Sequence, residues 1–207
     1  DAEVDRETWQ AMFARAVDRT FNRVSVDGDT STNDTILGLA NGASGIRAEG
    51  GDAALLEKGL TDILGRISYM LVKDGEGASK VMHITVSGAA SDEDACRIAR
   101  TVGHSQLVKT AIYGQDANWG RILCAIGYTP GDFSIDKVSV RIASKAGEVF
   151  VCENAAYHPF SEDEAYAVLG EHDILVKVDM GTGEASGKAW GCDLTYDYVK
   201  INGDYRT

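Results

Sequence analysis

This chain of 207 residues has few prolines, no surplus of basic residues and no long apolar runs. Two prolines leave no room for a Pro-rich linker. The 20 Lys and Arg against 32 Asp and Glu give a formal net charge of −12, so no basic footprint exists for nucleic acid or an anionic membrane. The longest apolar runs are too short to span a bilayer, and no secretory signal opens the chain. We therefore expect no nucleic-acid or membrane partner.

The few cysteines and histidines also lack the spacing of a metal site. None of the four cysteines forms a C-x-x-C pair, and the four histidines are equally scattered. Scattered free thiols in an acidic protein fit a reducing compartment, so we predict no metal, buried cysteines and a cytoplasmic location. Residue 1 is Asp rather than Met, and we expect the chain to be a processed product or a fragment.

Helical periodicity dominates the first third of the sequence. Apolar residues recur at helical spacing from Trp9 to Val24, with Asp5 in the N-cap position. A second helix is expected from a cap at Asp52 to Asp74-Gly75. Its predicted apolar face comprises Leu56, Leu60, Ile63, Leu64, Ile67 and Leu71.

Strands and helices mix after residue 80, which predicts an α+β fold with a boundary near residues 77–80. Strands are expected at 82–86, 138–142, 149–151 and 174–178, the middle two forming a hairpin. Helices are expected from the cap at Ser91 to Gly103, over 119–126, and from the cap at Ser161; residues 107–112 suit either structure. A hairpin turn at 181–184 leads into a final strand toward Tyr196.

Four segments could form sites, and each also has an ordinary structural explanation. Asp27-Gly28-Asp29 lacks the glycine and the final acid of a calcium loop, so a turn-rich cap is favoured. Residues 114–121 suit a helix cap slightly better than a binding loop. Glu76 lies between two glycines, a solvated turn that would also let backbone approach a ligand. The tail from Ile201 follows an alternating run and could dock instead of fraying.

Long segments of the sequence resemble one known family over nearly the whole chain. They include Ser25–Thr35, Lys73-Asp74-Gly75-Glu76-Gly77-Ala78, Val108–Gly114, Asp116–Ile122 and Trp190–Asn202. Together they resemble the second (β) chain of the ornithine acetyltransferase, or glutamate N-acetyltransferase, family of arginine biosynthesis.

The resemblance implies an enzyme made by self-cleavage before a threonine. The freed threonine is the nucleophile and its own amine is the general base. Acetyl passes from N2-acetylornithine to the threonine and then to glutamate by a ping-pong route. No cofactor is implied, although bifunctional members also use acetyl-CoA as a substrate. The nucleophilic threonine is expected just before Asp1, so no catalytic residue is assigned within this chain, which is expected to be inactive alone.

The same resemblance implies substrate-binding residues, partners and a fold. Glu76 is the expected carboxylate for an ornithine ammonium, and Asn202 and Thr207 belong to a C-terminal motif that returns to the active site. The partner is the α chain of the same precursor, in an α2β2 heterotetramer. The fold is the layered α+β sheet-and-helix architecture shared with N-terminal-nucleophile aminopeptidases. Residues 1–78 would form a helix-rich part shared with the α chain, and residues 79–207 a C-terminal domain.

Two other functions remain open on the sequence. A related self-cleaving aminopeptidase or amidase would release amine without needing an acceptor. A non-catalytic subunit that binds basic amino acids would bind ornithine by itself.

Overall fold

A computed structural model describes residues 1–205, which divide into two compact units. We call residues 1–23 and 29–70 the helical unit, and residues 24–28 with 71–205 the sheet unit. The helices are α1 (Arg6–Asp18), η1 (Phe21–Arg23), α2 (Gly50–Lys73), α3 (Asp92–His104), α4 (Gln106–Tyr113), α5 (Trp119–Gly127), α6 (Glu162–Leu169) and α7 (Tyr196–Asp204). The strands are β1 (Val24–Ser25), β2 (Val81–Ala89), β3 (Ser139–Ser144), β4 (Gly147–Glu153), β5 (Ala156–Tyr157), β6 (Asp173–Asp179) and β7 (Ala185–Cys192).

The helical unit is built on α1 and most of α2. The Asp5 carboxylate caps α1 by accepting from Thr8 N at 2.9 Å, which confirms the predicted cap. Glu57 of α2 pairs with Arg15 of α1 at 2.6 Å. Only four hydrophobic residues of this unit are buried: Met12, Ala16, Ala48 and Leu64. This is a thin apolar core for two helices.

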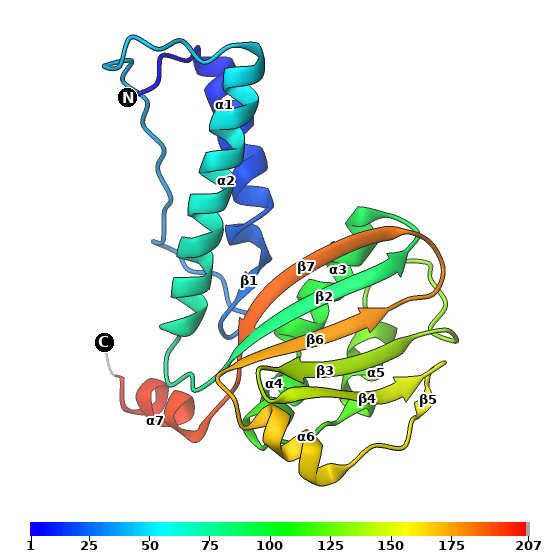
Figure 1. Ribbon diagram of the computed structural model, residues 1–207. Helices are drawn as coiled ribbons and strands as arrows, with labels where there is room; N and C mark the ends of the chain where they lie inside the picture. The colour runs from blue at the N-terminus through cyan, green and yellow to red at the C-terminus, as the bar shows by residue number, and fades with distance from the viewer. Residues whose placement is uncertain (206–207) are drawn as a thin grey trace. The chain divides into compact units, whose positions relative to one another are not determined.

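The sheet unit is a seven-stranded mixed sheet in the order β1-β7-β2-β6-β3-β4-β5. Strands β2 and β6 run parallel, as do β1 and β7, while the other neighbours are antiparallel. Along β2, the side chains of Met82, Ile84 and Val86 are buried and alternate with more exposed ones. Helices α3 to α6 gather on one face of this sheet (Figure 1). These layers confirm the predicted α+β sheet-and-helix fold.

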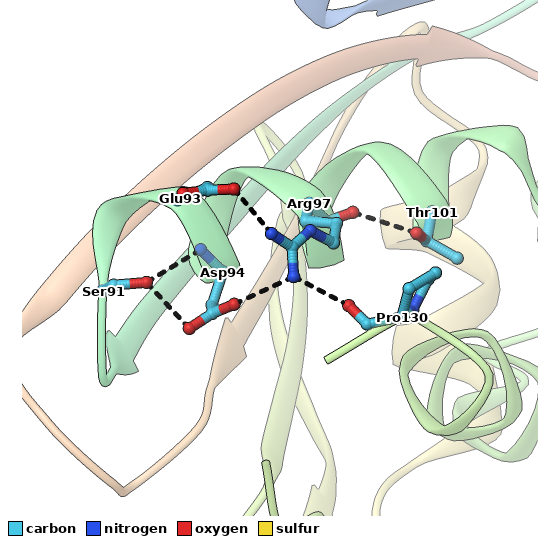
Figure 2. A network of polar contacts seen from close by, with 6 residues as sticks. All are labelled: Ser91, Glu93, Asp94, Arg97, Thr101 and Pro130. Carbon is cyan, nitrogen blue, oxygen red and sulfur yellow. Dashed lines mark hydrogen bonds and ion pairs between the residues drawn. The ribbon is translucent and has the colours of Figure 1, made fainter. Parts of the chain in front are cut away.

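Helix α3 shows how a local sequence signal fixes an element. Ser91 Oγ accepts from Asp94 N at 3.1 Å, as its predicted N-cap role requires. Arg97 then joins the carboxylates of Glu93 and Asp94 and donates to Pro130 O at 2.9 Å (Figure 2). The cap and the arginine together fasten the start of α3 to the loop after α5.

Two predicted helix ends are wrong. Helix α2 begins at Gly50, so Asp52 lies inside its first turn, where its carboxylate complements the helix dipole. Helix α3 continues through Gly103 to His104. A Cβ at Gly103 would lie 3.0 Å from Ile84 Cδ1, so this glycine serves close packing on β2 rather than termination. Residues 107–112, left open between strand and helix, form most of α4.

The predicted hairpin at residues 181–184 is also wrong. Strand β2 lies between β6 and β7, so the connection crosses the end of β2 instead of joining neighbours. Thr182 N and Gly183 N donate to Gly88 O at 2.8 and 2.7 Å, and this contact holds the connection over the strand. The hairpin of β3 and β4 is confirmed.

The final strand toward Tyr196 ends early. Strand β7 stops at Cys192, and Tyr196 starts helix α7, with Thr195 as its N-cap. The alternating run from Thr195 to Val199 suggested a strand, but the hydroxyl of Thr195 accepts from Tyr198 N and starts a helix there.

Burial of the cysteines is mixed. Cys152 and Cys192 are buried as predicted, Cys96 is half-buried, and Cys124 is exposed, contrary to the prediction. Within residues 1–205, no helix is long and apolar enough to cross a membrane.

Candidate functional site

Three segments meet at one end of the sheet because of the strand directions. Strands β1 and β7 are parallel, so the residues after both leave the sheet at the same edge. Strand β2 is antiparallel to β7, with Val81 opposite Cys192, so its incoming loop lies at that edge too. Residues 26–28, 74–80 and 193–195, far apart in sequence, therefore come together in the sheet unit.

Lys109 of α4 joins the ends of β1 and β7. Its Nζ donates to Val26 O at 2.6 Å and to Cys192 O at 2.7 Å, and its side chain is fully buried. Burial lowers the pKa of Lys109, an effect opposed by the negative forms of Cys192 and Asp193. A buried amine whose hydrogen bonds go to two carbonyls fixes the backbone of both segments.

Asp193 organises the loop that enters β2. Its Oδ1 accepts from Ser79 N at 2.8 Å and from Lys80 N at 2.9 Å, while its Oδ2 accepts from the Ser79 hydroxyl. The Asp193 side chain is buried, so these donors replace the water it loses. The loop after β7 and the loop before β2 are thereby held together.

Gly77 allows the same loop to lie directly on the start of α7. Its φ is +64°, and a Cβ there would lie 2.5 Å from Tyr198 N and 2.8 Å from the carbonyl carbon of Asp197. The hydroxyl of Thr195 donates to Gly77 O at 2.7 Å. Only glycine suits both the left-handed backbone and this close approach.

The structure brings together two of the three predicted substrate-binding residues. Asn202 Nδ2 donates to Glu76 Oε2 at 2.6 Å and to Tyr198 O at 3.1 Å. Both Glu76 and Asn202 are exposed, on the loop and on α7 respectively. The third predicted residue, Thr207, lies outside the described residues.

Helix α7, which carries Asn202, is also held by a polar contact to the segment after β1. The hydroxyl of Tyr198 donates to Asp27 Oδ2 at 2.9 Å, and Gln106 Nε2 donates to Asp27 O at 2.9 Å. His104 lies nearby at the end of α3. Burial lowers the pKa of its imidazole; Arg100 and Lys109 lower it further, while Asp27 opposes them.

The exposed polar groups of this surface include hydrogen-bond acceptors. The carboxylate of Glu76 can accept from a cationic amine, and the amide oxygen of Asn202 is a hydrogen-bond acceptor. Among residues 1–205, no group of three or more His, Cys, Asp or Glu is placed to hold a metal ion.

Sequence reasoning missed the residues that hold this surface in place. Lys109 lies on the same buried stripe of α4 as Val108 and Ile112, so a charged residue on an apolar helix face was the available signal. Asp193 has no comparable signal, because its partners are backbone N–H groups more than a hundred residues away in sequence.

Two other predicted segments take their ordinary structural roles. Asn118 caps α5 by accepting from Arg121 N at 3.1 Å, and the neighbouring Trp119 is half-buried. In the hydroxyl-rich segment of the helical unit, Ser31 Oγ accepts from Asn33 N and Asp34 N, so this side chain is bound to its own loop.

Comparison with known proteins gives consistent matches over the whole chain. A model described as the ArgJ family matches residues 1–207. The arginine biosynthesis bifunctional protein ArgJ of Nitratidesulfovibrio vulgaris is 51% identical over the whole chain and 52% of the relative. The glutamate N-acetyltransferase of Methanocaldococcus jannaschii is 40% identical over the whole chain and 52% of the relative. The chain thus spans about half the length of the curated relatives it matches.

A solved structure has the same fold. The crystal structure of the arginine biosynthesis bifunctional protein ArgJ from Bacillus halodurans superposes with a TM-score of 0.92 at 41% identity, covering 99% of this chain and 96% of that chain. A separate chain of about this length therefore occurs in a relative whose fold is the same.

Proposed function

The chain belongs to the ArgJ family, and on that premise we propose that it is the β chain of a glutamate N-acetyltransferase of arginine biosynthesis. The observation that carries the proposal is the Glu76–Asn202 pair, 2.6 Å apart on the surface where loops 26–28, 74–80 and 193–195 meet. The names of relatives at 40–51% identity support the same activity.

The proposed reaction is a ping-pong acetyl transfer through an acetyl-threonine. The hydroxyl oxygen of the threonine expected before Asp1 attacks the acetyl carbonyl carbon of N2-acetylornithine. The amide C–N bond breaks, and the departing ornithine amine takes the proton that the threonine amine removed from the hydroxyl. The amine of glutamate then attacks the ester carbonyl and gives up a proton to the threonine amine. The C–O bond breaks, that proton passes to the departing threonine oxygen, and N-acetylglutamate leaves with the hydroxyl restored.

In this proposal the residues of this chain bind rather than react. Glu76 holds the cationic end of the ornithine substrate, and Asn202 orients that carboxylate and contacts the substrate through its amide oxygen. Thr207 completes the same subsite. The partner is the α chain of the same precursor in an α2β2 assembly, and the protein works in the cytoplasm without a cofactor.

The central test is the substitution Glu76→Gln in the self-processed two-chain protein. Removing the charge while keeping the shape should raise KM for N2-acetylornithine about tenfold or more, since a hydrogen bond to a charged group contributes about 1.5–3 kcal/mol. KM for glutamate and self-cleavage should be unchanged. Glu162→Gln, an exposed acid in the first turn of α6, is the matched control. Equal KM values in the two variants would overturn the assigned role of Glu76.

The assay is run with and without glutamate to separate related activities. Without glutamate, the transferase should release about one equivalent of ornithine per active site and then stop, with continued release only when glutamate is present, whereas equal continued release without glutamate shows an amidase. Equilibrium binding of ornithine by this chain alone would show a binding subunit. Acetyl-CoA as a second donor is tested by mass spectrometry of the intact β chain, which gains one acetyl group if that donor is used.

A further inference from the structure

Helix α2 carries an apolar stripe that is exposed over its later part. The residues Leu56, Leu60, Ile63, Ile67 and Met70 follow one another at alternating spacings of four and three, the repeat of a coiled-coil seam. We call these five residues the α2 seam. Ile63 is 58% exposed, Ile67 40% and Met70 63%, while Leu56 and Leu60 are half-buried.

The α2 seam is distinct from the face that the helix buries. Leu64 and Ser68 are buried, and at 100° per residue their row lies roughly a third of a turn away from the seam. The helix therefore has a packed row at Leu64 and Ser68 and a separate apolar stripe that is exposed from Ile63 to Met70. The sequence pattern put Ile63 and Leu64 on one core-facing side, and the structure separates them.

A contiguous exposed apolar stripe of this length is unusual on the surface of a monomeric protein. Burying such aliphatic side chains is favourable because it removes apolar surface from water, and contiguous exposed patches mark interaction sites. The same unit also exposes Leu37 and Leu39, at 79% and 91%, on either side of Gly38. Gly38 itself is bound to α1, because Trp9 Nε1 donates to Gly38 O at 3.2 Å.

The length of the family indicates what covers the seam. The chain spans 52% of its curated relatives, so about half of the family's length lies outside this structure. The solved relative shows that a chain of about this length occurs separately. We propose that the α2 seam is the docking surface for an apolar helical face in that other half, the α chain of the proposed enzyme. This inference rests on the two-chain assembly in the proposed function, and it adds where the second chain packs.

The heptad spacing of the α2 seam favours a helix as the binding partner. Alternating spacings of four and three keep the apolar side chains in line, so that they fit between side chains of a helix lying alongside. Exposed Arg66 borders the seam and would lie at the rim of such an interface, where a charge sets orientation more than affinity.

Site-directed photocrosslinking in the full-length, self-processed protein tests the docking surface. A benzophenone amino acid replaces Ile63 in one variant and Lys58, an exposed α2 residue off the seam, in the control. We expect a covalent product joining the two chains from position 63 and little from position 58. Crosslinks from position 63 to a second copy of this chain, to residues 71–205, or at the same yield as position 58 would overturn the proposal.

A binding measurement gives a second, independent readout. Dissociation of the two chains on dilution is measured in the self-processed protein, and the variant with Ile63→Glu and Ile67→Glu is compared with Lys58→Glu. The seam variant should weaken association of the halves about tenfold or more, while helix content by circular dichroism stays the same because both side chains are exposed. Equal affinity of the seam and control variants would contradict the assignment.

The crosslink does not depend on catalysis, so the two proposals can fail separately. Crosslinking at position 63 without acetyl transfer would leave the α2 seam in place and reject the enzyme assignment. Acetyl transfer with crosslinks mapped elsewhere would keep the enzyme and reject the seam.

Discussion

The sheet unit and the helical unit differ in how many of their apolar side chains they bury. In the sheet unit a continuous core from β2, β3 and β6 is covered by α3, α5 and α6. Six of the eleven exposed large hydrophobic residues among residues 24–28 and 71–205 are tyrosines, whose hydroxyls tolerate water. In the helical unit four hydrophobic residues are buried, whereas the exposed ones are aliphatic or Met: Leu37, Leu39, Ile46, Leu55, Ile63, Ile67 and Met70. The sheet unit therefore has a continuous core of its own, whereas the helical unit buries few of its apolar side chains.

The largest expected effect comes from the core of the sheet unit. Ile142→Ala removes a fully buried side chain from β3 and should lower the free energy of unfolding by about 2–5 kcal/mol. Chemical denaturation of the two-chain protein measures the loss. The matched change in the helical unit, Ile63→Ala, should cost less than about 0.5 kcal/mol in this chain alone and more in the two-chain protein. A cost that is the same with and without the other half would break the comparison.

The two units also differ in how far their sequences predict them. In the sheet unit, caps at Ser91 and Ser161 and alternation over 174–178 predicted local structure correctly, because those signals depend on neighbours in sequence. The position of β2 between β6 and β7 was missed, since strand order depends on contacts between distant segments. In the helical unit, periodicity predicted α2, but it did not predict that Leu64 would be buried and Ile63 exposed.

The candidate site shows the same limit. The motif around Glu76 and the C-terminal motif around Asn202 were predicted to belong to one site from family resemblance, and the structure places the two side chains 2.6 Å apart. Their role in binding substrate stays a prediction, as does the catalytic domain that residues 1–78 would share with an α chain. Lys109 and Asp193, which hold the surrounding loops, act on backbone groups of segments far away in sequence. The apolar face of α4 marks Lys109 as unusual, but no local pattern identifies the partners of either residue.

The next effect in size concerns the loop that carries Glu76 in the sheet unit. Gly77→Ala places a Cβ 2.5 Å from Tyr198 N on a backbone of positive φ, so we expect a loss of about 1–3 kcal/mol in stability. KM for N2-acetylornithine should rise as well, because Glu76 moves with the loop. Gly59→Ala is the control in the helical unit, since its Cβ would meet nothing within 4 Å and Ala favours the helix. Gly59→Ala should therefore leave KM unchanged, and an equal rise in both variants would refute the role of the loop.

The smallest expected effect is a difference between the two units in how their stability depends on pH. Burial, with Arg100 and Lys109, lowers the pKa of His104 in the folded sheet unit below its ordinary value of 6.5. Between 6.5 and that lower pKa the unfolded chain binds a proton that the folded chain does not, so stability falls as the pH drops through this window and is unaffected above it. In the helical unit, the hydrogen bond from Arg15 lowers the pKa of Glu57 from 4.5, so stability from this pair is present above 4.5 and is lost only as the pH falls through the lower folded pKa.

Thermal melting at pH 7.5, 6.5 and 5.5 measures this difference. His104→Gln should flatten the decline in Tm between pH 6.5 and 5.5, because glutamine binds no proton in either state. Glu57→Gln should leave that decline intact and alter stability only below about pH 4.5. The opposite result, in which Glu57→Gln flattens the decline and His104→Gln does not, would place the acid-sensitive contact in the helical unit. The acid sensitivity would then come from the Arg15–Glu57 ion pair and not from the buried imidazole of His104.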